Sequence, residues 1–275
     1  MPEPAVNPNK ALWEKGDFTR IAASMRESGQ SFVASLGDVT ALSVLDLACG
    51  DGNTAIPLGQ AGANVRGIDI ASNLVAAGNT RAQDLHLSNV RFEEGDASHL
   101  DNVKDNSFDL LVSVFGAMFA PRPFDVAKEM YRVVKPGGRI VMANWIAGDP
   151  TLVAQILKIS ASYLPPPPEG FVSPVTWGME AHVQERFGKA GAAADRITCA
   201  RETWMFTLRD KPPLDLLQAF WDFYGPTMNA VAAADAAGRK ADLRQELEHL
   251  FVSQNAATDG STHIPAVYLR VTVRT

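Results

Sequence analysis

Short apolar runs and helical stretches alternate regularly between residues 43 and 145. Five buried strands are predicted, with the sequences SVLDLA, NVRGIDI, NVRFEEGDA, FDLLVSVFGA and PGGRIVMANW. Helical patterns fall between them at 72–86, where Ser72 is the expected N-cap, and at 124–134. Repeated strand–turn–helix units joined by short loops predict an α/β fold with a parallel, doubly wound sheet.

The flanking segments do not follow this rhythm. Apolar side chains at helical spacing between residues 11 and 36 predict one or two helices before the first strand. After the fifth strand, helices are expected at 151–163, 179–187 and 214–251. Two alternating stretches, ITCARETWMFTL and AVYLRVTVR, predict two more strands. The segment from about 146 to 255 is expected to form a cap that is inserted into the sheet or laid over it.

Composition restricts the classes of partner. The net charge is −6 and no long basic run is present, so nucleic acid is not expected. No apolar stretch reaches about 18 residues, and no integral membrane association is expected. Cys49 and Cys199 have no motif spacing, which favours a reducing, cytoplasmic compartment. The five histidines lack metal-ligand spacing, so no metal site is expected.

One loop carries the main chemical signal. The run from Asp46 to Thr54, DLACGDGNT, follows the first predicted strand, and its small residues let the backbone approach a ligand. A nicotinamide dinucleotide site would require Gly-x-Gly-x-x-Gly, but the best frame here has Ala48 and Asn53 in place of two glycines. An acid followed by Ala48, Gly50 and Gly52 fits better. The Asp46 carboxylate would repel a pyrophosphate but could anchor the ammonium group of an amino-acid moiety.

Two more acids follow successive strands. Asp69 ends the second strand, about 20 residues past the glycines, where a carboxylate can accept hydrogen bonds from ribose hydroxyls. Asp96, followed by Ala97, comes after the third strand, where it can accept from an adenine amine. Three such sites after three strands predict a nucleoside-binding edge of the sheet.

These residues resemble class I S-adenosylmethionine-dependent methyltransferases, particularly the ubiquinone/menaquinone-biosynthesis C-methyltransferase-like (methyltransferase type 11) group. The segments VLDLACGDG, GIDIA, EEGDA, SFDLLVSVFGAMF and EMYRVVKPGGRIVMANW carry the resemblance over about residues 43–146. It implies a Rossmann-like, seven-stranded sheet whose last strand is antiparallel, with S-adenosylmethionine as cofactor and S-adenosylhomocysteine as product. It implies cofactor contacts from Asp46, Ala48, Gly50, Gly52, Asn53, Asp69, Ile70, Asp96, Ala97 and Phe115.

We therefore expect an N-terminal helical segment that covers the cofactor (1–42), a cofactor-binding core (43–146), and an acceptor-binding, mainly helical cap with the last two strands (147–275). The expected reaction is in-line displacement at the sulfonium methyl by a small organic acceptor, held about 3–3.5 Å away. An NAD(P)-dependent oxidoreductase and a non-catalytic S-adenosylmethionine-binding protein are the alternatives. Association as a homodimer is compatible with the sequence.

The acceptor site is less defined. The apolar run 114–119 lacks the Asn/Asp-Pro-Pro-aromatic signature of enzymes that methylate nucleobase amines, and it supplies no general base. No catalytic residue is assigned, and His182 in the cap is the one candidate for a base. Met118, Trp145, Trp177 and Tyr224 are the candidates for an apolar acceptor pocket.

Overall fold

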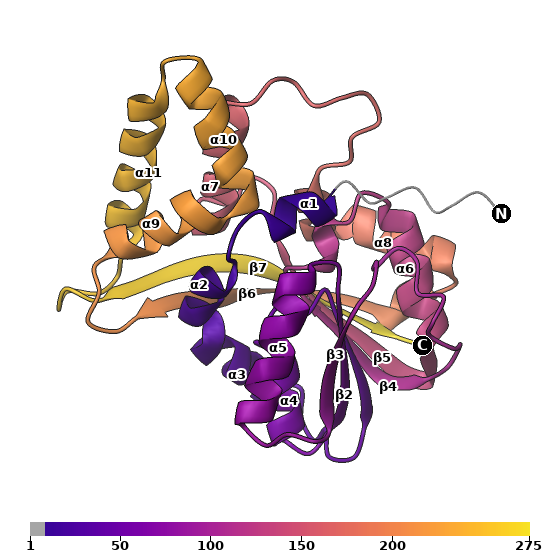
Figure 1. Ribbon diagram of the computed structural model, residues 1–275. Coiled ribbons are helices and arrows are strands. Elements are labelled where there is room, and N and C mark those ends of the chain that lie inside the picture. Colours follow the sequence, from indigo (N-terminus) through magenta and orange to yellow (C-terminus); the bar gives the residue numbers. More distant parts are fainter. Residues whose placement is uncertain (1–8) are drawn as a thin grey trace.

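The computed structural model of the protein describes residues 9–275, and residues 1–8 of the expected N-terminal segment lie outside the described residues. Within this range, seven strands form one sheet in the order β3-β2-β1-β4-β5-β7-β6 (Figure 1). β1 to β5 are parallel, and β7 runs antiparallel between β5 and β6. The predicted α/β class, the seven strands and the antiparallel last strand are confirmed. The strands are β1 (Ser43–Leu47), β2 (Asn64–Asp69), β3 (Val90–Glu94), β4 (Phe108–Val114), β5 (Val134–Trp145), β6 (Ile197–Leu208) and β7 (Thr262–Arg274).

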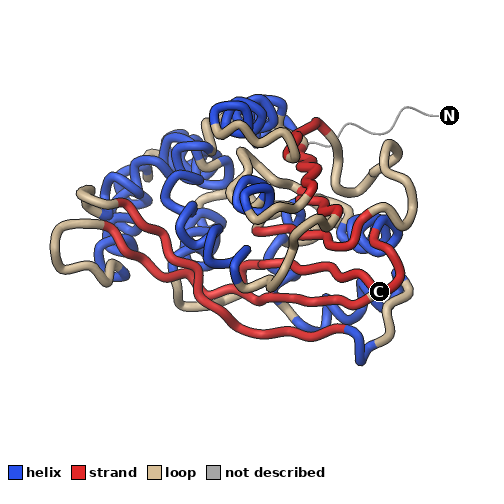
Figure 2. The backbone as a smooth tube through the Cα atoms, turned by 90° about the horizontal axis from the view of Figure 1, so that it is seen from below, coloured by secondary structure: helices blue, strands red, loops and turns tan. Residues whose placement is uncertain are grey.

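The central strands are buried because helices cover the sheet (Figure 2). β1 and β4 carry runs of apolar side chains without solvent exposure, as a strand covered on both faces requires. α4 (Ala55–Gln60) and α5 (Ser72–Asp84) pack against β2 and β3, and α3 (Arg26–Ala34) packs on α4. α6 (Pro123–Val133) packs on β5.

The predicted cap has two parts. α7 (Leu152–Ser162), α9 (Pro213–Phe223), α10 (Gly225–Ala236) and α11 (Lys240–Gln254) pack on one another, and all but α10 also pack on β7. η3 (Pro174–Gly178) and α8 (Glu180–Ala190) pack instead against β5 and α6. The two strands expected within 147–275 are β6 and β7, and β6 is the edge strand of the sheet. No helix within residues 9–275 combines the length and apolarity needed to cross a membrane.

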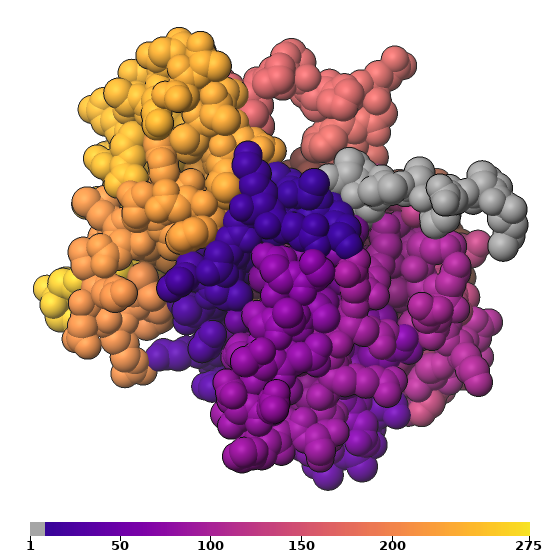
Figure 3. Space-filling view, in the orientation of Figure 1, coloured from indigo at the N-terminus to yellow at the C-terminus, as the bar shows by residue number. Residues whose placement is uncertain are grey.

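The N-terminal segment lies between the sheet core and the helices of the cap (Figure 3). It contains α1 (Asn9–Glu14), α2 (Thr19–Ala22) and η1 (Ala23–Met25). Two glycines allow this close packing, because a Cβ on Gly16 would lie 2.4 Å from the Phe223 carbonyl oxygen, and one on Gly225 would lie 2.8 Å from Leu12 Cγ. The segment is thus fitted to both halves of the molecule.

The prediction that Ser72 caps α5 is wrong. The N-cap is Ala71, and Ser72 is the first helical residue. The Ser72 backbone N–H and hydroxyl both donate to Glu14 Oε1, at 3.1 and 2.7 Å. A carboxylate from α1 therefore satisfies the helix N-terminus, which local sequence could not indicate.

Candidate active site

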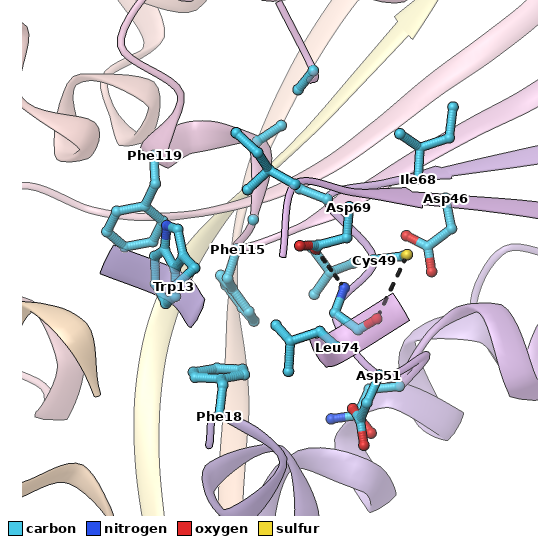
Figure 4. A pocket seen from close by; sticks show the side chains of 18 of the residues that line it. Trp13, Phe18, Asp46, Cys49, Asp51, Ile68, Asp69, Leu74, Phe115 and Phe119 are labelled. Carbon is cyan, nitrogen blue, oxygen red and sulfur yellow. Dashed lines mark hydrogen bonds between the residues drawn. The ribbon is translucent and has the colours of Figure 1, made fainter. Parts of the chain in front are cut away.

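A pocket opens at the edge of the sheet where β1, β2, β3 and β4 end, beneath α1 and α2 (Figure 4). Together with the part open to solvent, its empty space amounts to about 970 Å³. The predicted cofactor residues gather here because the carboxyl ends of parallel strands meet at one edge. All ten except Gly52 line the pocket, namely Asp46, Ala48, Gly50, Asn53, Asp69, Ile70, Asp96, Ala97 and Phe115.

The two glycines of the loop after β1 have different roles. Gly50 has φ +54°, and a Cβ there would meet no atom of residues 9–275 within 4 Å. Gly52 has φ +90°, but a Cβ there would lie 2.6 Å from the Phe92 ring, on the side of the core. Gly50 therefore leaves space beside the ligand, whereas Gly52 allows the loop to pack on β3.

The loops after β1 and β4 touch each other. Ala48 and Phe115 both have φ +57°, a conformation that L side chains rarely adopt. A Cβ on Gly116 would lie 2.3 Å from the Ala48 carbonyl oxygen. The small residues at 48 and 116 thus bring the Phe115 backbone to the pocket wall.

Asp46 is the most unusual group of the site. Its side chain is 1% exposed, and its Oδ2 has no hydrogen-bond partner among residues 9–275. Burial raises the Asp46 pKa to about 8, and the negative charge of Asp69 adds to the rise, while the Ala55 backbone N–H opposes it. A buried carboxylate oxygen left open on a pocket wall is suited to a cationic ligand group.

Asp69 supports the loop as well as the pocket. Its Oδ2 accepts a hydrogen bond from the Gly50 backbone N–H at 2.8 Å, and its Oδ1 accepts one from Ala71 at 2.9 Å. Burial raises the Asp69 pKa, and these backbone donors oppose the rise. Each carboxylate oxygen has a second lone pair, so Asp69 can hold the loop and accept from a ligand together.

Asp51 also lines the pocket, and sequence reasoning gave it no role. It is 2% exposed and pairs with Arg81 at 3.1 Å and Arg26 at 3.5 Å. Burial raises the Asp51 pKa, and the two guanidinium groups oppose the rise. An acid next to glycines gives no signal for this cluster, because its partners come from α3 and α5.

Aromatic rings form the other walls. Trp13, Phe18 and Phe119 line the pocket together, with ring centroids 5.8 Å apart for Trp13 and Phe18 and 5.1 Å apart for Trp13 and Phe119. Figure 4 shows these rings around the same opening. Phe115 and Trp204 meet edge to face at 4.9 Å on another wall. Trp204 comes from β6, far along the chain, and sequence reasoning missed it.

The four predicted acceptor residues, Met118, Trp145, Trp177 and Tyr224, are all buried and lie outside the pocket lining. Trp145 stacks on Phe115 at 3.6 Å, and Tyr224 lies 6.1 Å from Trp13. Trp145 and Tyr224 thus support lining rings from behind, whereas Trp177 packs against Phe187 and Arg186.

The remaining polar candidates lie apart from the acceptor end. His182 is on α8, 43% exposed at its side chain, with its Nδ1 3.9 Å from Glu185, and it does not line the pocket. Asp96 does line it, and its Oδ1 accepts hydrogen bonds from the Ser98 N–H and hydroxyl at 2.8 and 2.7 Å. In residues 9–275, no three His, Cys, Asp or Glu side chains gather as metal ligands.

Sequence comparisons find a methyltransferase domain and relatives that cover most of the chain. The family model described as "Methyltransferase domain" matches residues 45–142. The protein named "Uncharacterized protein Rv1405c" of Mycobacterium tuberculosis is 31% identical over 248 residues, covering 88% of this chain and 86% of its own. A demethylmenaquinone methyltransferase of Oceanobacillus iheyensis is 37% identical over 115 residues, covering 40% of this chain and 47% of its own.

Solved structures share the fold at low identity. The YcgJ protein of Bacillus subtilis has a TM-score of 0.57 at 18% identity, covering 90% of this chain and 99% of its own. A phosphoethanolamine N-methyltransferase 2 of Haemonchus contortus, solved with S-adenosyl-L-methionine, has a TM-score of 0.55 at 19% identity, covering 90% and 52%.

Proposed function

The chain belongs to the class I S-adenosylmethionine-dependent methyltransferases, and we propose that it methylates a small, largely apolar organic acceptor bound beneath three aromatic rings. They are Trp13 on α1, Phe18 at the N-cap of α2, and Phe119 on η2 (Ala117–Phe119). The observation that carries this proposal is the contrast between the two ends of one pocket. Buried Asp46, Asp51 and Asp69 and half-buried Asp96 line the end formed by the loops after β1, β2 and β3. Trp13, Phe18 and Phe119 line the other end.

The residues present fit the cofactor. The open Oδ2 of Asp46 suits the ammonium group of its amino-acid end. We assign binding of the ribose hydroxyls to Asp69 and binding of the adenine to Asp96 and Ala97. The Phe115 backbone is assigned to contact with the amine of the methionine part. The empty space over Gly50 supports a ligand passing close to the loop. The NAD(P) alternative is disfavoured, because an ionised Asp46 would repel a pyrophosphate.

When bound, the cofactor supplies an electrophilic methyl group on a sulfonium. The protein's part is to hold the acceptor in line and to exclude water, and positioning alone accounts for a large share of such rate enhancements. The titratable side chains that line the pocket within residues 9–275 are Asp46, Cys49, Asp51, Asp69 and Asp96. Burial beside Asp46 and Asp69 raises the pKa of the Cys49 thiol, so it is not poised as a nucleophile.

The lining also limits the class of acceptor. No Lys or Arg belongs to the pocket lining given by residues 9–275, so a phosphorylated acceptor would lack a charge partner. The H. contortus neighbour is named for such an acceptor, and the O. iheyensis relative for a quinone. The aromatic walls favour the second kind, and we propose phenols and quinol-like compounds. Of the four predicted acceptor residues, Trp145 and Tyr224 contact the lining rings of Phe115 and Trp13, and we propose that these two shape this end.

The two free cysteines favour a reducing, cytoplasmic setting for this activity. The proposal is tested by incubating the protein with S-adenosylmethionine and separate panels of quinols, phenols, thiols, amines and phosphoethanolamine, and by measuring S-adenosylhomocysteine. Turnover of quinols or phenols is expected. Turnover of phosphoethanolamine alone would contradict the acceptor class. Cofactor binding without turnover in any panel or in a cell extract would favour a non-catalytic binding protein.

A further inference from the structure

Trp204 on β6 is a pocket residue with an unused hydrogen-bond donor. Its side chain is 2% exposed and packs against Phe115 at 4.9 Å and Phe32 at 6.3 Å. The ring lines the pocket, yet its Nε1 has no hydrogen-bond acceptor in the part of the chain from 9 to 275. A buried N–H without an acceptor is unfavourable, so a ligand atom that accepts from it would remove a penalty.

Helix α3 brings Trp204 to the same end of the pocket as the glycine loop. The Ser28 hydroxyl bonds to both the N–H and the carbonyl of Met205, each at 2.9 Å, next to Trp204. The neighbouring residue, Gly29, lies so close to the loop that a Cβ there would be 2.5 Å from the Asn53 carbonyl oxygen. Two consecutive residues of α3 thus contact β6 and the glycine loop.

Two other lining side chains have unused polar atoms, and both are acceptors. They are Oδ2 of Asp46 and Oδ1 of Asn53, neither of which has a partner among the described residues. Asn53 Nδ2 already donates to the Ala22 carbonyl at 2.8 Å, so only its oxygen is available. Two unpaired acceptors and one unpaired donor, all on side chains that belong to the pocket lining, complement a zwitterion, with its ammonium group and its carboxylate.

The arginines near this end have another partner. Arg26 and Arg81 both pair with Asp51, at 3.5 and 3.1 Å, and neither lines the pocket. A ligand carboxylate would therefore meet the indole N–H of Trp204 without competition from a guanidinium in the lining.

We propose that the Trp204 indole N–H binds the carboxylate of the cofactor's amino-acid end, opposite Asp46 and Asn53, which take the ammonium group. This inference rests on the cofactor assignment under the proposed function. It extends the cofactor site to β6, which pairs antiparallel with β7 and lies outside residues 45–142 that match the methyltransferase family model. The C-terminal half then contributes to cofactor binding as well as to the acceptor side.

The test compares two ligands that differ only in the carboxylate, S-adenosylhomocysteine and its decarboxylated analogue. Trp204→Phe keeps an aromatic ring against Phe115 and Phe32 but removes the N–H. Calorimetry is expected to show S-adenosylhomocysteine binding weakened about 10-fold in this variant, with binding of the decarboxylated analogue unchanged. If both ligands bind more weakly to the same extent, Trp204 acts through packing and the proposal is refuted. The proposal is also refuted if neither ligand binds more weakly.

Trp177→Phe is the matched control. Trp177 is 1% exposed and its Nε1 also lacks a partner among residues 9–275, but it packs against Phe187 and Arg186 and does not line the pocket. Its variant should bind both ligands as the wild type does. A similar loss in both variants would show that removing any buried indole N–H disturbs the site, and would overturn the assignment.

The wild-type protein itself provides a second test, which applies even if Trp204→Phe does not fold. The wild type is expected to prefer S-adenosylhomocysteine over the decarboxylated analogue by about 10-fold or more. Equal affinity would overturn the inference while leaving the methyltransferase assignment intact. Failure of the folded wild type to bind either ligand would instead contradict the proposed function itself.

Discussion

Asp46→Asn separates what this carboxylate does for the ligand from what it does to the fold. The Asp46 pKa is raised to about 8, whereas its ordinary value is 3.8. Each pKa unit corresponds to about 1.36 kcal/mol. Holding Asp46 ionised at pH 8 or above therefore destabilises the unliganded fold by roughly 5 kcal/mol.

This destabilisation has a defined pH dependence. At pH values below 3.8 the Asp46 carboxyl is protonated in both the folded and unfolded states, so it contributes no difference. As the pH rises toward 8, the unfolded chain loses the proton first and the free energy of unfolding falls. Asparagine cannot ionise, so the substitution removes this pH-dependent destabilisation. Its amide nitrogen would lack a hydrogen-bond acceptor, which destabilises the fold by about 1–3 kcal/mol. The variant should melt near the wild-type temperature at about pH 5 and roughly 4–8 °C higher at about pH 8.5.

The assay is thermal unfolding without ligand across this pH range, followed by calorimetry with S-adenosylhomocysteine. Asp46→Asn should bind the ligand about 10- to 100-fold more weakly while being the more stable protein above neutral pH. Asp109→Asn is the control, because Asp109 bonds to Lys135 and the Ser43 N–H, which hold its pKa below the usual range. It should lower stability above neutral pH and leave binding unchanged. A melting difference for Asp46→Asn that does not grow with pH would refute the reasoning.

Wild-type affinity for S-adenosylhomocysteine should rise with pH up to about 8, by at most tenfold per unit, with release of a proton from Asp46; a flat profile would exclude Asp46 as the ammonium partner. Gly50→Val should abolish binding, while Gly37→Val, also at positive φ but outside the pocket lining, should only lower stability; normal binding by Gly50→Val would remove the loop from the site. Asp69→Ala should weaken S-adenosylhomocysteine binding about 10- to 100-fold, measured by calorimetry. It should also destabilise the fold by about 1–3 kcal/mol, measured by denaturant unfolding, because the Gly50 N–H loses its acceptor; if either effect is absent, the double role of Asp69 is wrong. His182→Ala should change kcat by no more than about two-fold and leave its pH dependence unchanged, because His182 lies outside the pocket lining. Loss of one ionisation from the pH profile would instead indicate that His182 acts as a general base.

The sequence predicted those parts of the structure that depend on local pattern and on the geometry of parallel sheets. Apolar runs followed by glycines or acids identified the strand ends, and parallel strands bring those ends to one edge. Asp46, Asp69 and Asp96 consequently line one pocket, as expected. Gly52 could not be separated from Gly50 by sequence, because the contact that turns it to the core is a ring on β3, Phe92.

The parts that sequence did not predict depend on contacts between distant segments. Trp204 reaches the pocket only because β6 pairs with β7 and is held against α3 by Ser28. Asp51 has its role through arginines on two other helices. Ser72 does not cap α5, and its N–H and hydroxyl donate instead to the carboxylate of Glu14 on α1. None of these partners lies at a fixed sequence spacing from the residue that it contacts, so no sequence motif could indicate the contact.

The central claim is that the pocket at the carboxyl edge of the sheet binds the cofactor through its nucleoside and its amino-acid end. Calorimetric titration of the wild-type protein with S-adenosylhomocysteine, with NAD as the comparison ligand, tests it most directly. Saturable binding of one S-adenosylhomocysteine per chain, with no heat from NAD, is the predicted result. Absence of S-adenosylhomocysteine binding by the folded protein, or NAD binding of similar affinity, would contradict the claim.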